Sequence, residues 1–188
     1  MIYLIIGGTC CGKTSFVKNT WLKGRVFEAK KDILHYVETE EVIILGKWSN
    51  IDGRERSGTD TISRSQIHLI GEQVKSLLKH NKDIVVEGDK ATFRKVFNEL
   101  LGFGPIKLFH ITSTIDKIID RYYANGSSSS LSSVKASRTK AANVFMEYKD
   151  MMNGEEVDTS GLNEEDFKIL SLYNYKQYQK ENDTIKLF

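Results

Sequence analysis

Nine consecutive residues near the start of the chain carry the clearest chemical signal in the sequence. They read Gly7-Gly8-Thr9-Cys10-Cys11-Gly12-Lys13-Thr14-Ser15, which matches the phosphate-binding pattern G-x-x-x-x-G-K-[ST] without a gap. Glycines let such a loop curl so that successive backbone N–H groups face one anion. In this pattern Lys13 reaches the β- and γ-phosphates, Thr14 binds Mg²⁺ through its hydroxyl, and Ser15 is expected mainly to extend the following helix. The motif predicts a nucleoside triphosphate site, with ATP favoured over GTP as the commoner case.

The residues on either side of this motif are those that would hold such a loop in place. Residues 2–6 form a short apolar run without a charged side chain, as expected of a parallel strand buried on both faces. Residues 14–22 are expected to form a helix whose positive dipole end points at the phosphates. A glycine-rich turn that binds nothing is the alternative, but the order of strand, loop and helix favours the nucleotide site.

Apolar runs and helical spacing alternate along the next part of the chain. The pattern predicts strands at residues 33–37, 42–45, 84–86 and 106–111. It predicts helices from residue 63, around residues 93–101 and around residues 115–122. Because strands alternate with helices, we expect a three-layer α/β fold in which helices cover both faces of a parallel sheet. Residues 1–188 are expected to form a single domain of the P-loop type.

The last third of the sequence has a different composition. Residues 125–133 are rich in serine and are expected to form a flexible loop, followed by a helix over residues 134–152. The segment 151–166 contains six acidic residues and no lysine or arginine, which is typical of a solvated linker. A closing helix is expected over residues 164–181.

Transfer of a phosphoryl group also needs a carboxylate that accepts or orients the acceptor's proton. Asp60 is the first candidate, although it could instead cap the helix that follows it. Asp52 and Asp89 are alternatives, and so is Glu87. Glu87 ends a predicted strand at the edge where ligands bind in open α/β sheets, so it could hold Mg²⁺ or contact the acceptor. A solvated strand-end glutamate is the other interpretation.

Transfer needs cations that stabilise the charge moving toward the leaving oxygen as well. Arg121 ends a predicted helix, the serine-rich loop follows, and Arg138 lies on the next helix. A helix with an arginine, a loop and a second helix with an arginine could form a helical lid over residues 121–150 that excludes water. Two surface charges without a catalytic role are the alternative.

Composition and motifs exclude several classes of protein. The hydrophobic content of 40% suffices for an ordinary core, and the formal charge of +2 gives no general basic field. No apolar run approaches the ~20 residues of a membrane helix, and adjacent Cys10 and Cys11 suit neither a disulfide framework nor a zinc site. The chain is too short for a motor or helicase, lacks the Asn-Lys-x-Asp of GTPases, and lacks a strand ending in apolar residues plus Asp. We therefore expect a cytoplasmic protein, in the host cytoplasm if it is viral, without membrane contact or an obligate protein partner.

The sequence resembles P-loop kinases that act on nucleotides and nucleic acids, and in particular bacteriophage 5-hydroxymethyluracil DNA kinases. The resemblance covers most of residues 1–150. It rests on the motif at residues 7–15, on Ile44-Leu45-Gly46-Lys47, on Gly58-Thr59-Asp60-Thr61-Ile62-Ser63, on Glu87-Gly88, and on Arg121 and Arg138. It implies the P-loop kinase fold, ATP and Mg²⁺, and transfer of the γ-phosphate to the hydroxymethyl group of a base in DNA during thymine hypermodification. The acidic segment and the serine-rich loop have no counterpart in that family.

A DNA acceptor would need cations for its backbone phosphates and a surface for the extruded base. Candidate cations are Arg54, Arg56, Arg64, Lys135, Arg138 and Lys140. Trp48 could stack on the base, although such a tryptophan is more often a loop anchor. A kinase of free deoxynucleoside monophosphates is a second hypothesis, in which Arg54 and Arg56 hold the acceptor's phosphate. A nucleotide-binding switch or regulatory module is the third.

Overall fold

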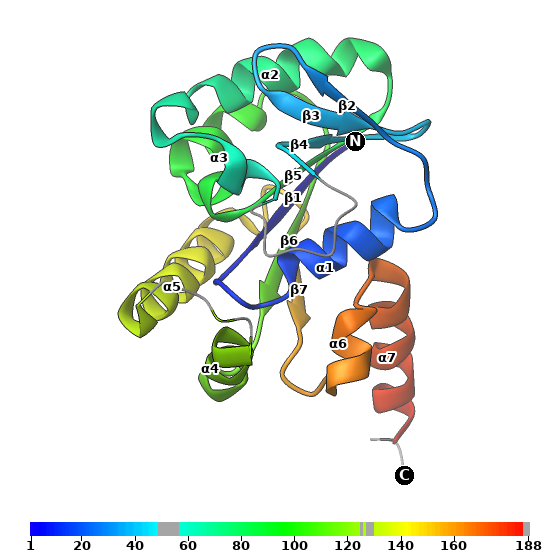
Figure 1. Ribbon diagram of the computed structural model, residues 1–188, viewed down its shortest axis with the longest axis vertical. Helices are drawn as coiled ribbons and strands as arrows, with labels where there is room; N and C mark the ends of the chain where they lie inside the picture. The colour runs from blue at the N-terminus through cyan, green and yellow to red at the C-terminus, as the bar shows by residue number, and fades with distance from the viewer. Residues whose placement is uncertain (49–56, 125, 127–129, 186–188) are drawn as a thin grey trace.

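A single β-sheet forms the centre of the molecule. The computed structural model describes residues 1–48, 57–124, 126 and 130–185. Within them the strands are β1 (Ile2–Gly7), β2 (Glu28–Lys31), β3 (His35–Glu38), β4 (Val42–Leu45), β5 (Asp83–Glu87), β6 (Ile106–Thr112) and β7 (Glu155–Asp158). They form one seven-stranded sheet in the order β2-β3-β4-β5-β1-β6-β7, with β1 near its middle (Figure 1). The α/β class expected from the alternating pattern is confirmed.

Helices lie against both faces of this sheet. The α-helices of the described residues are α1 (Lys13–Val17), α2 (Leu69–Leu77), α3 (Arg94–Leu100), α4 (Ile115–Ala124), α5 (Leu131–Tyr148), α6 (Glu164–Lys168) and α7 (Leu172–Ile185). A π-helical turn, η1 (Lys18–Leu22), continues α1, and 3-10 turns lie at η2 (Thr59–Thr61), η3 (Arg64–Gln66), η4 (Leu78–His80) and η5 (Asp89–Thr92). No helix in the described part of the chain is long and apolar enough to cross a membrane.

The sheet is parallel from β4 through β5, β1 and β6 to β7, but antiparallel at its other end. There β2 pairs with β3 and β3 with β4 in antiparallel register, so the expectation of an entirely parallel sheet is wrong. The reason is the length of the connections, which are residues 32–34 and 39–41. A parallel pair needs a crossover of about a dozen residues or more, whereas such short turns can join only antiparallel neighbours.

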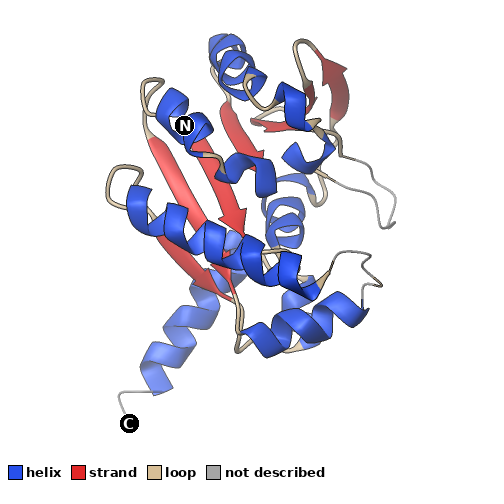
Figure 2. Cartoon of the chain, turned by 90° about the vertical axis from the view of Figure 1, so that its left-hand side faces the viewer, coloured by secondary structure: helices blue, strands red, loops and turns tan. Residues whose placement is uncertain are grey.

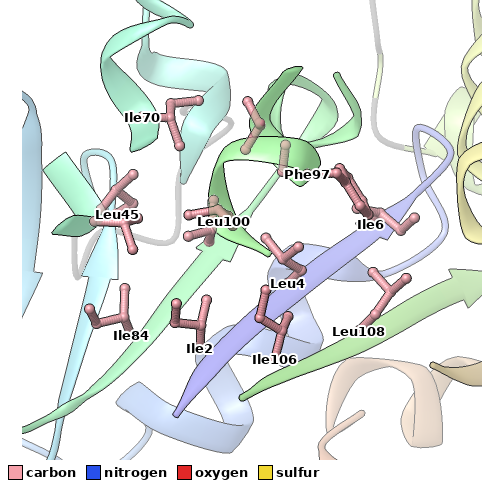
Figure 3. Packing of buried hydrophobic residues seen from close by; sticks show 14 of the residues in the cluster. Ile2, Leu4, Ile6, Leu45, Ile70, Ile84, Phe97, Leu100, Ile106 and Leu108 are labelled. Carbon is pink, nitrogen blue, oxygen red and sulfur yellow. The ribbon is translucent and has the colours of Figure 1, made fainter. Parts of the chain in front are cut away.

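The central strand β1 is buried on both faces, which explains its uninterrupted apolar run. Ile2, Leu4 and Ile6 face one side, where they pack with α2, α3 and the second half of α5 (Figure 3). Ile5 faces the other side and packs in a second cluster with residues of α1, α4 and α7. Because this strand is fixed from both faces, the loop that follows it starts from a rigid point.

Helix α5 belongs to the layer that covers the sheet. Ala141, Val144, Phe145 and Tyr148 are buried, and Figure 2 shows the long helix lying across the strands. The helix was expected to form half of a lid over residues 121–150. The second half of α5 packs on the sheet through these residues, so this half belongs to the core layer, while a closing movement of the lid stays a prediction.

The acidic segment 151–166 is not a linker, because it contains β7 and the start of α6. Val157 of β7 is buried, and the acidic side chains of this edge strand meet basic partners on β6. Glu155 lies 2.9 Å from Lys107, and Glu156 lies 3.0 Å from His110. Composition indicated a solvated segment, whereas these cross-strand pairs allow an acidic strand to join the sheet.

The closing helix expected over residues 164–181 is divided into α6 and α7.

Candidate active site

The glycine-rich loop, residues 8–12, connects β1 to α1 at the carboxyl end of the parallel strands. Cys10 and Gly12 have φ values of 61° and 101°, in the left-handed region that allows a tight turn. A Cβ atom on Gly12 would lie 2.7 Å from the ring of Phe167, and one on Gly8 would lie 3.0 Å from Cα of Arg138. The loop is therefore packed between α5 and α6, and larger residues do not fit at these two glycines.

Lys13 is buried at the base of this loop, with 7% of its surface exposed. Its Nζ atom donates hydrogen bonds to the carbonyls of Gly7 (3.1 Å) and Gly8 (2.9 Å) and lies 3.3 Å from Oδ1 of Asp89. Burial alone would lower the pKa of Lys13, but the carboxylates of Asp89, Glu87 and Asp60 outweigh it and raise the pKa. The ammonium therefore stays charged in a site shielded from water.

Glu87 ends β5 beside this lysine and is 1% exposed, so it is not a solvated strand-end residue. Its Oε2 atom has no hydrogen-bond partner among the described residues. Burial raises the pKa of Glu87 to about 8, while Lys13 and a hydrogen bond from Thr14 act in the opposite direction. A buried carboxylate oxygen without a donor, next to a hydroxyl, fits a site that receives a cation.

Asp60 lies in η2 and is brought to the same cluster by the turn that follows Gly58. Its Oδ1 atom accepts the backbone N–H of Asp89 (2.9 Å), and it does not cap the helices that follow, whose N-cap residues are Ser63 for η3 and His68 for α2. Lys90 holds the loop by donating to the carbonyl of Asp60 (3.0 Å) and to that of Ile62. Burial and then the charge of Asp89 raise the pKa of Asp60, which makes its carboxylate a better proton acceptor.

Two arginines lie close to the glycine-rich loop. They are held by hydrogen bonds to the residues that follow β6 and β7. Arg121 donates to Oγ1 of Thr159 (3.0 Å) and to the Thr159 carbonyl (3.0 Å), and its guanidinium lies 3.6 Å from the centre of the Phe167 ring. Arg138 donates from Nε to the carbonyl of Ser113 (3.1 Å). These are fixed positions close to the loop rather than free surface charges.

A cavity of about 450 Å³ opens beside α1 and runs between α4 and α6. Ser15 of α1 lines it, and the Arg121–Phe167 stack forms part of its wall. Lys117, Asp120 and Asn163 supply polar groups around the wall. The cavity has the volume of an ordinary small-molecule site and the flat cation–aromatic surface on which a planar ring can stack.

The structure places the residues predicted for the acceptor side in different surroundings. Trp48 is buried and donates from Nε1 to the carbonyl of Leu45 (3.0 Å), so it anchors a loop and offers no face for a base. Arg64 and Lys140 line a second cavity that also includes Asp89. Lys135 is exposed on α5 and lines neither this cavity nor the one beside α1. Asp52, Arg54 and Arg56 lie outside the described residues.

Several residues of the site were not expected from the sequence. Ser137 of α5 accepts the N–H of Thr9 at Oγ (3.0 Å), and Ser57 lies with its Oγ 3.2 Å from Oγ1 of Thr14. Thr159 follows β7 and donates from Oγ1 to the carbonyl of Cys11 (3.4 Å). Thr159 could have been proposed if β7 had been predicted, because the residues that follow parallel strands gather at one edge of the sheet. Ser57 and Ser137 belong to no motif, so no signal in the sequence pointed to them.

No protein-family model matches the chain, and the comparison with curated proteins finds no relative. Within the described residues, no three His, Cys, Asp or Glu side chains are grouped so that they could hold a metal ion by themselves. Mg²⁺ is commonly bound through one or two protein oxygens together with phosphates and water. Thr14 and Glu87 are the side chains whose chemistry fits that arrangement.

Proposed function

We propose that the protein is an ATP-dependent phosphotransferase that moves the γ-phosphate to the hydroxyl of a modified base in DNA. The observation that carries this proposal is the meeting of Lys13 with Asp89, Glu87 and Asp60 at the end of the glycine-rich loop. A buried ammonium beside a loop of curled backbone suits a polyphosphate, while carboxylates from two other loops suit a cation and an acceptor hydroxyl.

Each group has a distinct part in the proposed reaction. Lys13 and the N–H groups of the loop bind the phosphates and stabilise the charge that builds on the leaving oxygen. Thr14 and Glu87 would hold Mg²⁺, which neutralises part of the negative charge of the phosphates. The cavity beside α1 would take the base of ATP against Arg121 and Phe167, because it starts next to the loop that holds the phosphates.

The acceptor approaches from the opposite side, where Asp60 and Asp89 lie. Its oxygen attacks the γ-phosphorus, the new O–P bond forms as the bond to the β–γ bridging oxygen breaks, and the acceptor's proton passes to a carboxylate. The raised pKa of Asp60 favours it as the proton acceptor. The resemblance to 5-hydroxymethyluracil DNA kinases and the cations Arg64 and Lys140 beside Asp89 support a hydroxymethylated base in DNA as the acceptor.

A radiolabel transfer assay tests this function. The protein is incubated with γ-labelled ATP, Mg²⁺ and, in separate reactions, unmodified DNA, 5-hydroxymethyluracil DNA or a free deoxynucleoside monophosphate. Label on the hydroxymethylated DNA alone, absent with Lys13→Ala, is the expected result. Label on a free monophosphate and none on DNA would make the protein a nucleotide kinase. Slow hydrolysis without transfer to any acceptor would contradict both and favour a nucleotide-binding switch.

A further inference from the structure

A groove leads away from the acceptor side of the candidate site, between α5 and the start of α3. It consists of two adjoining hollows of about 360 and 730 Å³. The two hollows share four lining residues and are therefore continuous: Thr92, Phe93, Ala136 and Lys140. Nothing in the proposed phosphate transfer itself requires a groove of this length.

The inner end of the groove meets the reacting groups. Asp89 lines it and lies 3.3 Å from Nζ of Lys13, and Ser137 lines it and accepts the N–H of Thr9. A ligand lying in the groove can therefore place one end beside Asp60, Asp89 and the glycine-rich loop while the rest extends outward.

The lining of the groove suits an anion with flat rings. Arg64, Lys90 and Lys140 line the inner hollow, with Asp89 as its acidic residue, and Arg94 and Lys95 line the outer one. The Lys140 ammonium lies 3.7 Å from the centre of the half-buried Phe93 ring. Within the described part of the chain, Arg64 and Lys140 form no ion pair, whereas Arg94 is paired with Glu147. Two unpaired cations beside an aromatic ring are the features that bind phosphates and bases of a single strand.

The length of the groove indicates a polymer. Its lining on α5 runs from Ser133 to Val144, which at 1.5 Å per residue is a rise of about 16 Å. Phosphates of a stacked strand repeat every ~3.4 Å along the axis. A groove of that length spans several phosphates, whereas a free mononucleotide would fill only its inner end.

We propose that this groove binds the phosphodiester backbone of a single nucleic-acid strand, with the nucleotide to be phosphorylated at the Asp89 end. This inference rests on the proposed function and adds the path of the flanking strand. A single strand also delivers its base to Asp60 without first unpairing it from a duplex.

Fluorescence anisotropy with a labelled 12-nucleotide single strand tests the groove directly. The variant Arg64→Ala/Lys140→Ala is compared with a matched control, Lys31→Ala/Lys79→Ala, which removes two exposed lysines that line none of the cavities described above. We expect about tenfold weaker binding for the groove variant alone. The slope of log K against log salt should fall by about 1.4, because each lost phosphate contact on a single strand contributes ~0.7. The affinity for ATP should be unchanged.

The outcomes separate the groove from the proposed function. The groove would be overturned if both double variants lost the same affinity for the strand, or if the groove variant lost none. It would also be overturned if the protein bound a duplex more tightly than the single strand and the groove variant bound that duplex normally. Transfer to a free nucleotide without binding or phosphorylation of the strand would also overturn it, while the phosphotransferase would stand. Absence of transfer to any acceptor would overturn the proposed function and, with it, the groove as an acceptor path. Phe93→Leu keeps an apolar side chain against the core, and we expect it to weaken strand binding severalfold with an unchanged melting temperature.

Discussion

Nζ of Lys13 lies 3.3 Å from Oδ1 of Asp89, although the two residues are 76 positions apart in the sequence. The same ammonium donates to the carbonyls of Gly7 and Gly8, so it points back into its own loop. Under the proposed function, a bound nucleotide takes the place of these partners, because its phosphates carry the stronger charge. The Asp89 carboxylate is then released from Lys13 at the moment when the acceptor needs a group to orient its hydroxyl.

Replacing Lys13 tests the centre of the proposal. We expect Lys13→Ala to lower the rate of phosphate transfer by about 10³-fold or more, because this ammonium stabilises charge in transit. The rate is measured by label transfer under saturating ATP. Lys23→Ala, which removes an exposed lysine, is the control and should keep the normal rate. A near-normal rate in Lys13→Ala would rule out the phosphate-binding role of the loop.

The roles of the two aspartates are tested through kcat for Asp60 and through the Kd for ATP for Asp89. Asp60→Asn should lower kcat by about 10²-fold or more while the Kd for ATP stays nearly constant, because it removes the proposed proton acceptor. Asp89→Asn removes the carboxylate that lies 3.3 Å from Nζ of Lys13, which the phosphates replace under the proposed function, so the Kd for ATP should not rise. If Asp60→Asn lowers only the melting temperature, its role is to hold the N–H of Asp89 and the proton acceptor is another carboxylate.

The cavity beside α1 is tested with two ligands. Phe167→Leu should raise the Kd for ATP by about tenfold, because it removes the ring that stacks with Arg121. The Kd for inorganic tripolyphosphate, which has no base, should stay the same. Isothermal titration calorimetry measures both constants, and Arg25→Ala, on a surface ion pair with Glu41, is the control. Parallel losses for both ligands would place the base elsewhere.

Glu38 should make stability depend on acid pH. Hydrogen bonds from Lys30 and then Lys82 lower the pKa of this buried carboxyl to about 2 in the folded protein. Because the folded pKa lies below that of the unfolded chain, Glu38 stabilises the fold above about pH 4.5, and this contribution is lost as the pH falls toward 2. Glu38→Gln should cost about 2 kcal/mol at pH 7 and less at pH 3, as measured by urea unfolding.

An exposed glutamate provides the comparison for that measurement. Glu72→Gln, on the open side of α2, should change the free energy of unfolding by less than about 0.5 kcal/mol at either pH. A cost for Glu38→Gln that stays the same from pH 7 to pH 3 would contradict the ion-pair explanation and indicate a packing effect.

The strands that consist of apolar residues could be predicted from the sequence, whereas the charged strands could not. The apolar runs at residues 42–45 and 106–111 lie within β4 and β6, since a strand buried on both faces has a visible composition. β2 and β7 were missed, because they are short edge strands whose charged side chains look like those of a loop. Their place in the sheet depends on partners such as Lys107 and His110, which lie far away in the sequence.

In the candidate site too, residues in local motifs could be predicted, whereas residues brought in by packing could not. The motif around Lys13 could be read directly from residue types and spacing, and Glu87 and Asp60 from their positions after apolar segments. The wall formed by Ser137, Thr159 and Phe167 could not, because these residues reach the loop through the packing of α5, β7 and α6. Trp48 was misassigned because sequence does not reveal whether an indole near a loop points into the core.

The residues that hold β1 and the glycine-rich loop in place lie far along the sequence and are therefore synthesised after the loop. β1 pairs with β5 and β6, Thr9 is held by Ser137, and Gly12 packs against Phe167. During translation, the loop leaves the ribosome while most of these partners have not yet been synthesised. Under the proposed function, a nascent chain released before Phe167 has emerged would have no place for a nucleotide. Nucleotide binding would therefore report that the chain has been synthesised at least as far as α6.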